Sequence, residues 1–329
     1  MFNNKTILIT GGTGSWGHEL TKRLIGYNPK EIRIFSRSED AQVKMLRAFR
    51  NNPVLKFVIG DVRDAQAVDE ACKGVNYVFH LAALKHVPIC EEQPYEAIKT
   101  NIVGTENIIR ASIKYKVDKV INVSTDKAVD PINLYGLTKA IGEKLIIHAN
   151  SKDRNTRFVC VRGGNVLGTS GSVVPFFKKQ IAEGQDVTLT STEMTRFFLT
   201  LSDCIGLLIK AAEASIGGEI FVMKMNSCRI LDLAHVLIDQ YAENPVAVKE
   251  IGIRAGEKLH EALLTKYEAA HAYHFDKQYF VILPPQPSEE IVEYYKDLNE
   301  AVNEEYESNR NFMTPEEITG MLRLGGFLS

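Results

Sequence analysis

Lys5–Ile25 reads KTILITGGTGSWGHELTKRLI, and this stretch decides the fold. An apolar, β-branched run to Thr10 is followed by glycines at G-x-x-G-x-x-G spacing and then by a helical pattern from His18. A strand, a glycine turn and a helix in this order let bare backbone and a helix N-terminus approach a pyrophosphate. The sequence therefore predicts a dinucleotide at this turn. The residues expected to contact it are Gly11, Thr13, Gly14, Ser15, Trp16 and Gly17.

Five further apolar runs alternate with helical patterns. They cover Glu31–Phe35, Leu55–Ile59, Tyr77–Leu81, Lys119–Val123 and Phe158–Arg162. Strands that alternate with helices are typical of a parallel sheet covered on both faces. We predict an α/β fold in which residues 1–165 form a Rossmann-type, doubly wound parallel sheet that binds the cofactor. Residues 166–329 are predicted to form a smaller α/β domain, mainly for the substrate, with some segments packing back on the first.

The end of the second strand bears on the type of dinucleotide. Ser36 and Arg37 stand about twenty residues after the last glycine, where an NAD enzyme places an acidic residue for the ribose diol. Serine and arginine suit a 2′-phosphate, so the sequence favours NADP. In the alternative, Arg37 is a solvated surface charge and Glu39 or Asp40 binds the ribose.

The ends of the third and fourth strands complete the expected cofactor site. Asp61 places a carboxylate where the adenine amino group can donate to it, although a helix-capping aspartate in a turn fits the same sequence. Small residues after the fourth strand let the chain pass close to the cofactor. Asn101 either ties its helix to the active-site strand through a water or is a surface asparagine. The cofactor contacts expected here are Asp61, Val62, Ala82, Ala83 and Lys85.

The fifth strand ends in Ser124–Lys127, and Tyr135 and Lys139 follow it. The Tyr-x-x-x-Lys spacing puts the phenol and the amine one helical turn apart, where the lysine can hold the phenolate. A hydroxyl, a carboxylate, a phenol and amines are the groups needed to move a hydride and two protons. Alternatively, Asp126 and Lys127 form a salt bridge and Tyr135 packs in the core. The predicted catalytic residues are Thr125, Asp126, Lys127, Tyr135 and Lys139, of which the last two also face the cofactor.

Composition excludes several classes of function. The net charge of -2 gives no electrostatic reason for binding nucleic acid or an anionic membrane. The five cysteines are odd in number and form no C-x-x-C pair, so neither a disulfide framework nor a zinc site is indicated. The N-terminus lacks the layout of a signal peptide, and no apolar run approaches membrane-spanning length. We expect a reduced, cytoplasmic enzyme without a metal.

Two arginines stand out in the second half of this near-neutral chain. Arg196 in MTRF and Arg254 in IRAGEK could clamp a diphosphate through bidentate hydrogen bonds. Taken singly, each also fits a surface salt bridge.

The glycine turn, the six alternating strands and the Tyr135–Lys139 pair together resemble the extended short-chain dehydrogenase/reductase family, whose members act on nucleotide sugars. Retaining 4,6-dehydratases of that family carry Ser-Thr-Asp-Glu where this chain has Ser-Thr-Asp-Lys. This lysine and five further motifs resemble those of the inverting UDP-N-acetylglucosamine 4,6-dehydratases of the pseudaminic-acid and capsule pathways. The five motifs are ALKHVP, DPINLYG, GSVVPFF, MTRF and GEKLHE. The likeness runs to about Leu264. One departure is Gly163, which replaces a family tyrosine that could line the sugar pocket.

The resemblance implies a ligand set for the site. It implies UDP-N-acetylglucosamine as substrate, a tightly bound and recycled NADP, and a homo-oligomer of two or more chains. The implied substrate contacts are Lys85, His86, Asn165, Ser172, Val173, Arg196, Arg254 and Glu257.

The resemblance also implies a mechanism. Tyr135 as phenolate takes the C4 hydroxyl proton while the C4 hydride passes to the nicotinamide, and Thr125 and Lys139 hold the phenolate. Neutral Lys127 then removes the C5 proton as protonated Asp126 donates to the departing C6 hydroxyl. This requires the pKa of Lys127 to be lowered by burial and neighbouring positive charge. The hydride returns to C6 and a proton to the opposite face of C5.

Three other functions remain open on the sequence alone. Hydride return to C4 would release a 5,6-unsaturated sugar nucleotide. A simple 4-epimerase would need neither Asp126 nor Lys127. A non-catalytic NADP-binding regulator usually lacks the tyrosine or the lysine of the pair, and both are present in this chain.

Overall fold

The first half of the chain alternates strands with helices, as the sequence predicts. The structure, a computed structural model, describes residues 1–153, 155–168, 172–301 and 305–328. The elements up to the end of the sixth strand are β1 Thr6–Thr10, α1 Ser15–Ile25, β2 Glu31–Ser36, α2 Glu39–Ala48, β3 Leu55–Ile59, α3 Ala65–Cys72, β4 Tyr77–His80, α4 Val87–Glu92, α5 Pro94–Ile98, the π-helix η1 Lys99–Val103, α6 Gly104–Lys114, β5 Lys119–Val123, the 3-10 helix η2 Asp126–Ala128, α7 Leu134–Lys152 and β6 Arg157–Arg162.

The second half is less regular and contains shorter elements. They are β7 Asn165–Val166, α8 Val173–Ala182, β8 Val187–Leu189, β9 Thr195–Leu199, α9 Leu201–Ala214, β10 Ile220–Met223, β11 Ser227–Arg229, α10 Ile230–Tyr241, β12 Val248–Glu250, β13 Ala262–Leu264, α11 Lys266–Ala269, β14 Ala272–His274, β15 Tyr279–Ile282, α12 Glu289–Tyr295, β16 Tyr306–Glu307 and α13 Pro315–Leu324.

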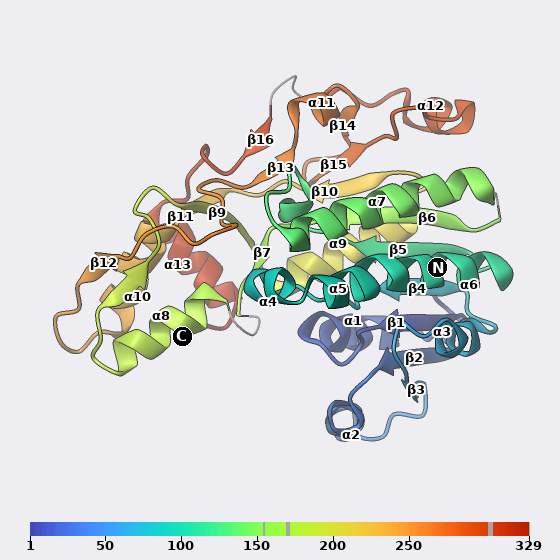
Figure 1. Cartoon of the computed structure of the whole chain (residues 1–329), viewed down its shortest axis with the longest axis horizontal. Helices are drawn as coiled ribbons and strands as arrows, with labels where there is room; N and C mark the ends of the chain where they lie inside the picture. Colours follow the sequence, from blue (N-terminus) through green and yellow to red (C-terminus); the bar gives the residue numbers. More distant parts are fainter. Residues whose placement is uncertain (154, 169–171, 302–304, 329) are drawn as a thin grey trace.

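A nine-stranded sheet in the order β14-β15-β10-β6-β5-β4-β1-β2-β3 organises the molecule (Figure 1). The strands from β3 to β10 in this order pair in parallel, whereas β15 and β14 run antiparallel to their neighbours. The predicted α/β, doubly wound fold is therefore confirmed, with a mixed and mainly parallel sheet. Strands β10, β14 and β15 come from beyond residue 165 and complete this sheet.

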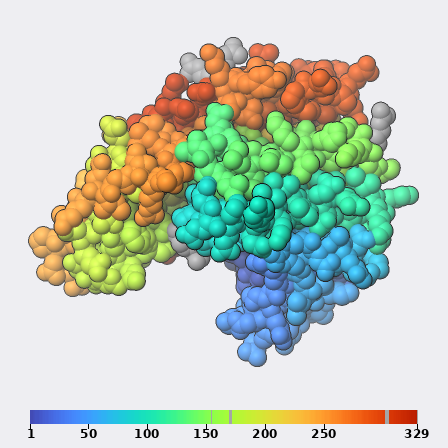
Figure 2. Space-filling model, viewed as in Figure 1, coloured from blue at the N-terminus to red at the C-terminus, as the bar shows by residue number. Residues whose placement is uncertain are grey.

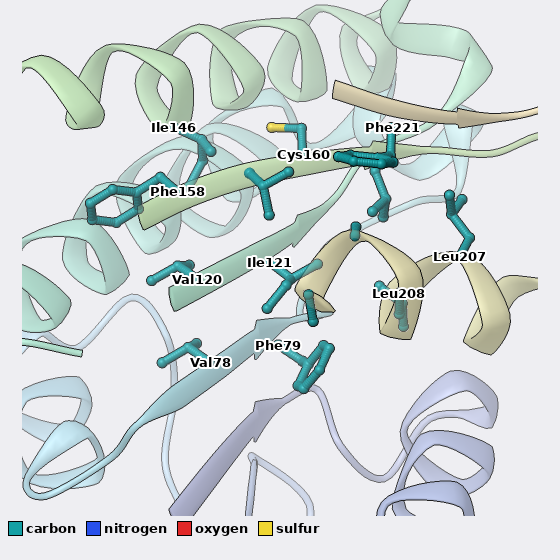
Figure 3. Close-up of a cluster of buried hydrophobic side chains, with 14 of the residues drawn as sticks. Val78, Phe79, Val120, Ile121, Ile146, Phe158, Cys160, Leu207, Leu208 and Phe221 are labelled. Carbon is teal, nitrogen blue, oxygen red and sulfur yellow. The ribbon is translucent and has the colours of Figure 1, made fainter. Parts of the chain in front are cut away.

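The main core lies between the sheet and its helices, as Figure 3 shows for the central strands. Val120 and Ile121 of β5 are completely buried, because a parallel strand covered on both faces has no solvent side. Ile146 of α7 and Leu208 of α9 are buried in the same cluster.

A second, smaller core lies beyond the main sheet. It joins α8, α10 and α13, which cluster at the left of Figure 1. The space-filling view shows the outline indented between this part and the N-terminal, blue part (Figure 2). The assignment of cofactor binding to residues 1–165, and of substrate binding mainly to residues 166–329, stays a prediction. The boundary near residue 165 also stays a prediction. In the described ranges, no helix combines the length and apolar character needed to cross a membrane.

Candidate active site

One cavity of about 790 Å³ collects the predicted site residues. Its walls come from the carboxyl ends of β1, β2, β4 and β5 and from the loop around residues 254–257. This is the edge at which open α/β sheets bind ligands. Of the predicted residues, only Asp126 does not line it. The others, all on its wall, are Gly11, Thr13, Gly14, Ser15, Trp16, Gly17, Ser36, Arg37, Asp61, Val62, Ala82, Ala83, Lys85, His86, Thr125, Lys127, Tyr135, Lys139, Asn165, Ser172, Val173, Arg196, Arg254 and Glu257.

The glycine turn is shaped for the close approach of a ligand. Gly11 has φ +65°, and a Cβ added to it would lie 2.9 Å from Ala82 Cα. A Cβ on Gly17 would lie 2.1 Å from the carbonyl oxygen of Gly12, so α1 packs directly on the turn. Helix α1 carries no acidic residue in its first turn, and its first three residues line the cavity. The chain therefore offers the bare backbone and helix N-terminus that a pyrophosphate requires.

Another part of the cavity wall carries the residues that are expected to lie near the ribose of the dinucleotide. Ser36 and Arg37 line it, and Arg37 is mostly exposed, with its guanidinium 4.0 Å from Asp61. Asp61 does not cap a helix, because Asp64 is the N-cap of α3. Both carboxylate oxygens of Asp61 instead accept hydrogen bonds from Arg63. The adenine contact predicted for Asp61 stays a prediction.

Asn101 is a structural link. It is 1% exposed, so its reading as a surface asparagine is wrong. It lies in the π-helix η1, a helix type that is frequent at functional sites. Its side chain exchanges hydrogen bonds with both backbone groups of Leu84 and donates to Thr138 Oγ1 at 2.9 Å. Asn101 thus joins the loop after β4 directly to α7, the helix that carries Tyr135 and Lys139.

Lys127 is held by three acceptors. Its Nζ lies 3.1 Å from Asp126 Oδ1 and 3.2 Å from Asn165 Oδ1. It also lies 3.3 Å from Oε1 of Glu261. An ammonium group has three N–H donors, so each donor faces an acceptor. Both carboxylates are buried, at 0% exposure for Asp126 and 2% for Glu261.

These contacts overturn one expectation about Lys127. Burial lowers the pKa of Lys127, but the charges of Asp126 and Glu261 outweigh burial and raise this pKa above that of an ordinary lysine. The expected lowering of the Lys127 pKa is therefore wrong for this arrangement, in which the side chain is a paired ammonium. Burial raises the pKa of Glu261, although Lys127 opposes that change.

The tyrosine and lysine of the Tyr-x-x-x-Lys pair are both shifted by burial. Burial raises the pKa of Tyr135 to about 12, against the charge of Lys127 and a hydrogen bond with Thr125. Burial also lowers the pKa of Lys139 to about 8. The phenol is thus not a phenolate near neutral pH in this arrangement, and a further positive charge beside it is needed to lower its pKa.

The predicted substrate residues of the second half converge on the catalytic cluster. Arg196, on β9, is 5% exposed, and it lies 3.5 Å from Glu257 and 3.8 Å from Glu261. Arg254 is exposed on the cavity wall. The Asn133 side chain caps α7 and donates to the carbonyl of Gly256 at 2.8 Å. This bond places the loop of Arg254 against the start of the catalytic helix.

Glu261 is the residue that the sequence analysis missed. It lies in the GEKLHE motif, which was used only for its family likeness. The signal available in the sequence was an acidic residue beside an apolar run, Ala262–Leu264, which predicts a strand end. Within the described residues, no group of three His, Cys, Asp or Glu could hold a metal ion.

The chain was compared with known proteins. It matches the family described as polysaccharide biosynthesis protein over residues 7–283. The UDP-N-acetylglucosamine 4,6-dehydratase (inverting) of Campylobacter jejuni is 47% identical, over 85% of this chain and 84% of that protein. The UDP-glucose 4-epimerase of Rickettsia rickettsii is 49% identical, over 83% of this chain and 81% of that protein.

Solved structures agree with the fold. The X-ray structure of Pen from Bacillus thuringiensis superposes with a TM-score of 0.92 at 37% identity, covering 100% of this chain and 99% of that one. DesIV from Streptomyces venezuelae, a dTDP-glucose 4,6-dehydratase with NAD bound, superposes with a TM-score of 0.72 at 19% identity, covering 97% and 96%. The second likeness shows the fold alone.

Proposed function

Since the chain belongs to the polysaccharide biosynthesis protein family and is a nucleotide-sugar-modifying enzyme, we propose that it is an NADP-dependent, inverting UDP-N-acetylglucosamine 4,6-dehydratase. Its product would be UDP-2-acetamido-2,6-dideoxy-β-L-arabino-hexos-4-ulose. The observation that carries the proposal is the ion pair of buried Asp126 with half-buried Lys127, close to Tyr135 at the end of β5. An enzyme that only oxidises and reduces C4 has no use for that pair.

The residues of the site fit a nicotinamide dinucleotide. The glycine turn leaves no room for a Cβ at Gly17, and it faces the same cavity as Tyr135 and Lys139. When bound, the dinucleotide would supply the hydride acceptor and donor of the reaction, and its oxidised nicotinamide would add a positive charge to the cavity that Tyr135 lines. That charge would lower the pKa of the phenol toward the working range.

NADP is favoured over NAD by the groups at the ribose end. Ser36 and Arg37 line the cavity, whereas Glu39 and Asp40 do not, and Asp40 pairs with Lys44 instead. Arginine is suited to a 2′-phosphate because its planar guanidinium binds phosphate oxygens in a bidentate manner.

We propose the following roles for the catalytic residues, and their shared place on the cavity wall or beside it supports these roles. Tyr135 takes the C4 hydroxyl proton, with Thr125 as its hydrogen-bond partner. Oxidation of C4 makes the C5 proton acidic, and Lys127 in its neutral form removes it. Asp126 in its acid form donates to the C6 hydroxyl, which leaves as water. Arg196 and Arg254 would hold the diphosphate.

The setting of the enzyme is also part of the proposal. The family description supports a role in polysaccharide biosynthesis, and we propose that the product enters bacterial surface glycan synthesis in a pseudaminic-acid or capsule pathway. All five cysteines are free thiols, which supports a reducing cytoplasm. Leu137 and Ile141 are each 45% exposed on the outer face of α7 and support a homo-oligomer.

Two alternative reactions have specific support. Release of a 5,6-unsaturated product is favoured by Gly163, which is buried and brings no ring to the sugar pocket. A Cβ at this position would meet Leu199 at 3.6 Å. 4-Epimerisation is favoured by the name of the Rickettsia relative.

Proton NMR of UDP-N-acetylglucosamine in heavy water, with purified protein and no added cofactor, separates these reactions. We expect a 4-keto-6-deoxy sugar with deuterium at C5 and the ring couplings of the inverted configuration. Vinyl signals would indicate the 5,6-unsaturated product, and a 4-epimer without deuterium at C5 would overturn the dehydratase proposal.

A further inference from the structure

Glu261 shares the ammonium of Lys127 with Asp126. Its Oε1 lies 3.3 Å from Lys127 Nζ, while its Oε2 has no hydrogen-bond partner. The residue is 2% exposed and lines the same cavity as Lys127 and Tyr135. A buried carboxylate oxygen without a hydrogen-bond partner costs folding free energy. Its presence beside Lys127 therefore points to a functional role for Glu261.

The backbone fixes Glu261 in this position. The amide of Glu261 donates to Ser308 Oγ at 2.9 Å, and the amide of Ser308 donates to the carbonyl of Glu261 at 2.8 Å. Arg196 lies 3.8 Å from the carboxylate and is itself buried. The carboxylate therefore reaches Lys127 from a rigid support outside the first half of the chain.

The reaction proposed above, on which this inference rests, needs a neutral Lys127 and a protonated Asp126 together. Lys127 contacts three acceptors, and one of them must take its proton. The carboxamide oxygen of Asn165 does not accept a proton near neutral pH. In the proposed reaction Asp126 is the acid that supplies the proton of the leaving hydroxyl, so it cannot at the same step accept the proton of Lys127. Glu261 is the remaining contact.

We propose that Glu261 is a positioning residue that takes the proton of Lys127 before C5 is deprotonated. One N–H bond of Lys127 breaks, its electron pair stays on nitrogen, and an O–H bond forms on Oε1 of Glu261. The freed electron pair then removes the C5 proton. Lys127 then passes that proton to Asp126, which has given its own proton to the leaving hydroxyl, and the proton on Glu261 returns to the nitrogen, so all three groups are restored at the end of the cycle.

The exchange of the C5 proton with heavy water, followed against pH, tests this assignment. In the parent enzyme the proton of Lys127 moves to Glu261 within the site. The transfer therefore adds no pH dependence to the exchange rate near neutral pH. In Glu261→Gln, the ammonium of Lys127 has to lose its proton to water before the neutral amine can act as the base. Exchange should then be slower on the order of 100-fold at pH 7 and should recover about tenfold per pH unit as the pH rises.

Two further variants act as controls. Glu261→Asp keeps the carboxylate and should restore the flat profile at a reduced rate, which a purely structural role does not predict. Glu257→Gln removes a charge beside Arg196 but none beside Lys127, so it should change KM without adding the pH slope.

Reduction of the bound nicotinamide by substrate, read from its absorbance, reports on the step before C5 chemistry. In Glu261→Gln this signal should persist, which shows a folded and loaded site. A flat exchange profile at the parent rate in that variant would overturn the inference and assign the proton to Asp126. Absence of both nicotinamide reduction and exchange in the parent enzyme would instead contradict the proposed function. If Glu261→Gln does not fold, a steep profile in Glu261→Asp would contradict the inference.

Discussion

Nη2 of Arg162 lies 2.7 Å from Oε2 of Glu143, and neither side chain is more than 4% exposed. Arg162 also lies 3.0 Å from Glu268 of α11. The ion pairs join β6 to helix α7 through Glu143 and to α11 of the second half through Glu268. Helix α7, which carries Tyr135 and Lys139, is therefore held to β6 by a buried ion pair.

Replacing Arg162 by Met should destabilise the protein by about 3–5 kcal/mol, because Glu143 and Glu268 then stay buried without a counter-charge. Urea denaturation followed by circular dichroism measures the change. Arg157 is the matched control at the other end of the same strand, since its partner Glu290 is 60% exposed. Arg157→Met should cost less than about 1 kcal/mol. Equal losses would show that burial of the pair is unimportant.

Lys127→Ala should abolish deuterium exchange at C5 while the bound nicotinamide is still reduced by substrate, because only the second step needs the amine. Tyr135→Phe should block both signals, because the phenol acts in the first step. Rapid mixing with absorbance and NMR detection separates the two. Unchanged exchange in Lys127→Ala would remove this residue from the role of base.

Gly17→Ala should lose the cofactor that copurifies with the parent protein, because the new Cβ meets the carbonyl of Gly12 at 2.1 Å. We expect a loss of stability of about 1–3 kcal/mol as α1 moves away from the turn. Gly320→Ala in α13 is the control, since a Cβ there has no atom within 4 Å. It should leave cofactor content unchanged and raise the melting temperature slightly.

Arg37→Ala should weaken NADP binding on the order of 10–100-fold and leave NAD binding unchanged, because only NADP carries the phosphate that the guanidinium meets. Isothermal titration of protein freed of cofactor gives both dissociation constants. Lys44→Ala, on the exposed face of α2, should change neither. Equal weakening for the two dinucleotides would favour the NAD alternative.

His80 should make the protein less stable in mild acid. Burial lowers the pKa of His80 to about 3, and its ring nitrogens lie 2.7 Å from Thr10 Oγ1 and 3.2 Å from Thr105 Oγ1. Below about pH 6.5 the unfolded chain binds a proton at this residue that the folded chain does not, so stability falls as the pH falls.

Because of His80, the free energy of unfolding should fall by about 1.4 kcal/mol for each pH unit as the pH is lowered from about 6.5 to 3. His80→Gln should remove this part of the dependence, as measured by urea midpoints at several pH values. His148→Gln, on an exposed face of α7, should leave the slope as in the parent. An unchanged slope in His80→Gln would contradict the assignment.

The central sheet could be predicted from the sequence because each strand is a short apolar run bounded by turn residues. Strands β3 and β5 begin and end where predicted, and β2 ends one residue later than predicted, at Ser36. The place of β10, β14 and β15 in the same sheet could not be predicted. Strand pairing across long separations depends on tertiary packing, which leaves little trace in a four-residue run.

The residues of the site could be predicted better than their charges. Nearly all predicted contacts line one cavity, because the carboxyl ends of parallel strands meet at one edge. The charge state of Lys127 depends on Glu261, which is remote in sequence, so a motif read locally could not show it. Conversely, Asp126 is adjacent to Lys127 and its pairing follows directly from the chain.

The pairing of β10 with β6 has a consequence for synthesis on the ribosome. Once β6 has left the ribosome it can pair with β5 along one edge, but its other edge stays open until β10, which begins only at Ile220, has also emerged. An apolar strand with an open edge is a site for association with other chains. The nascent chain therefore passes through an interval in which β6 has an unpaired edge that favours association with other chains, and a fragment that ends at residue 165 would keep that edge open.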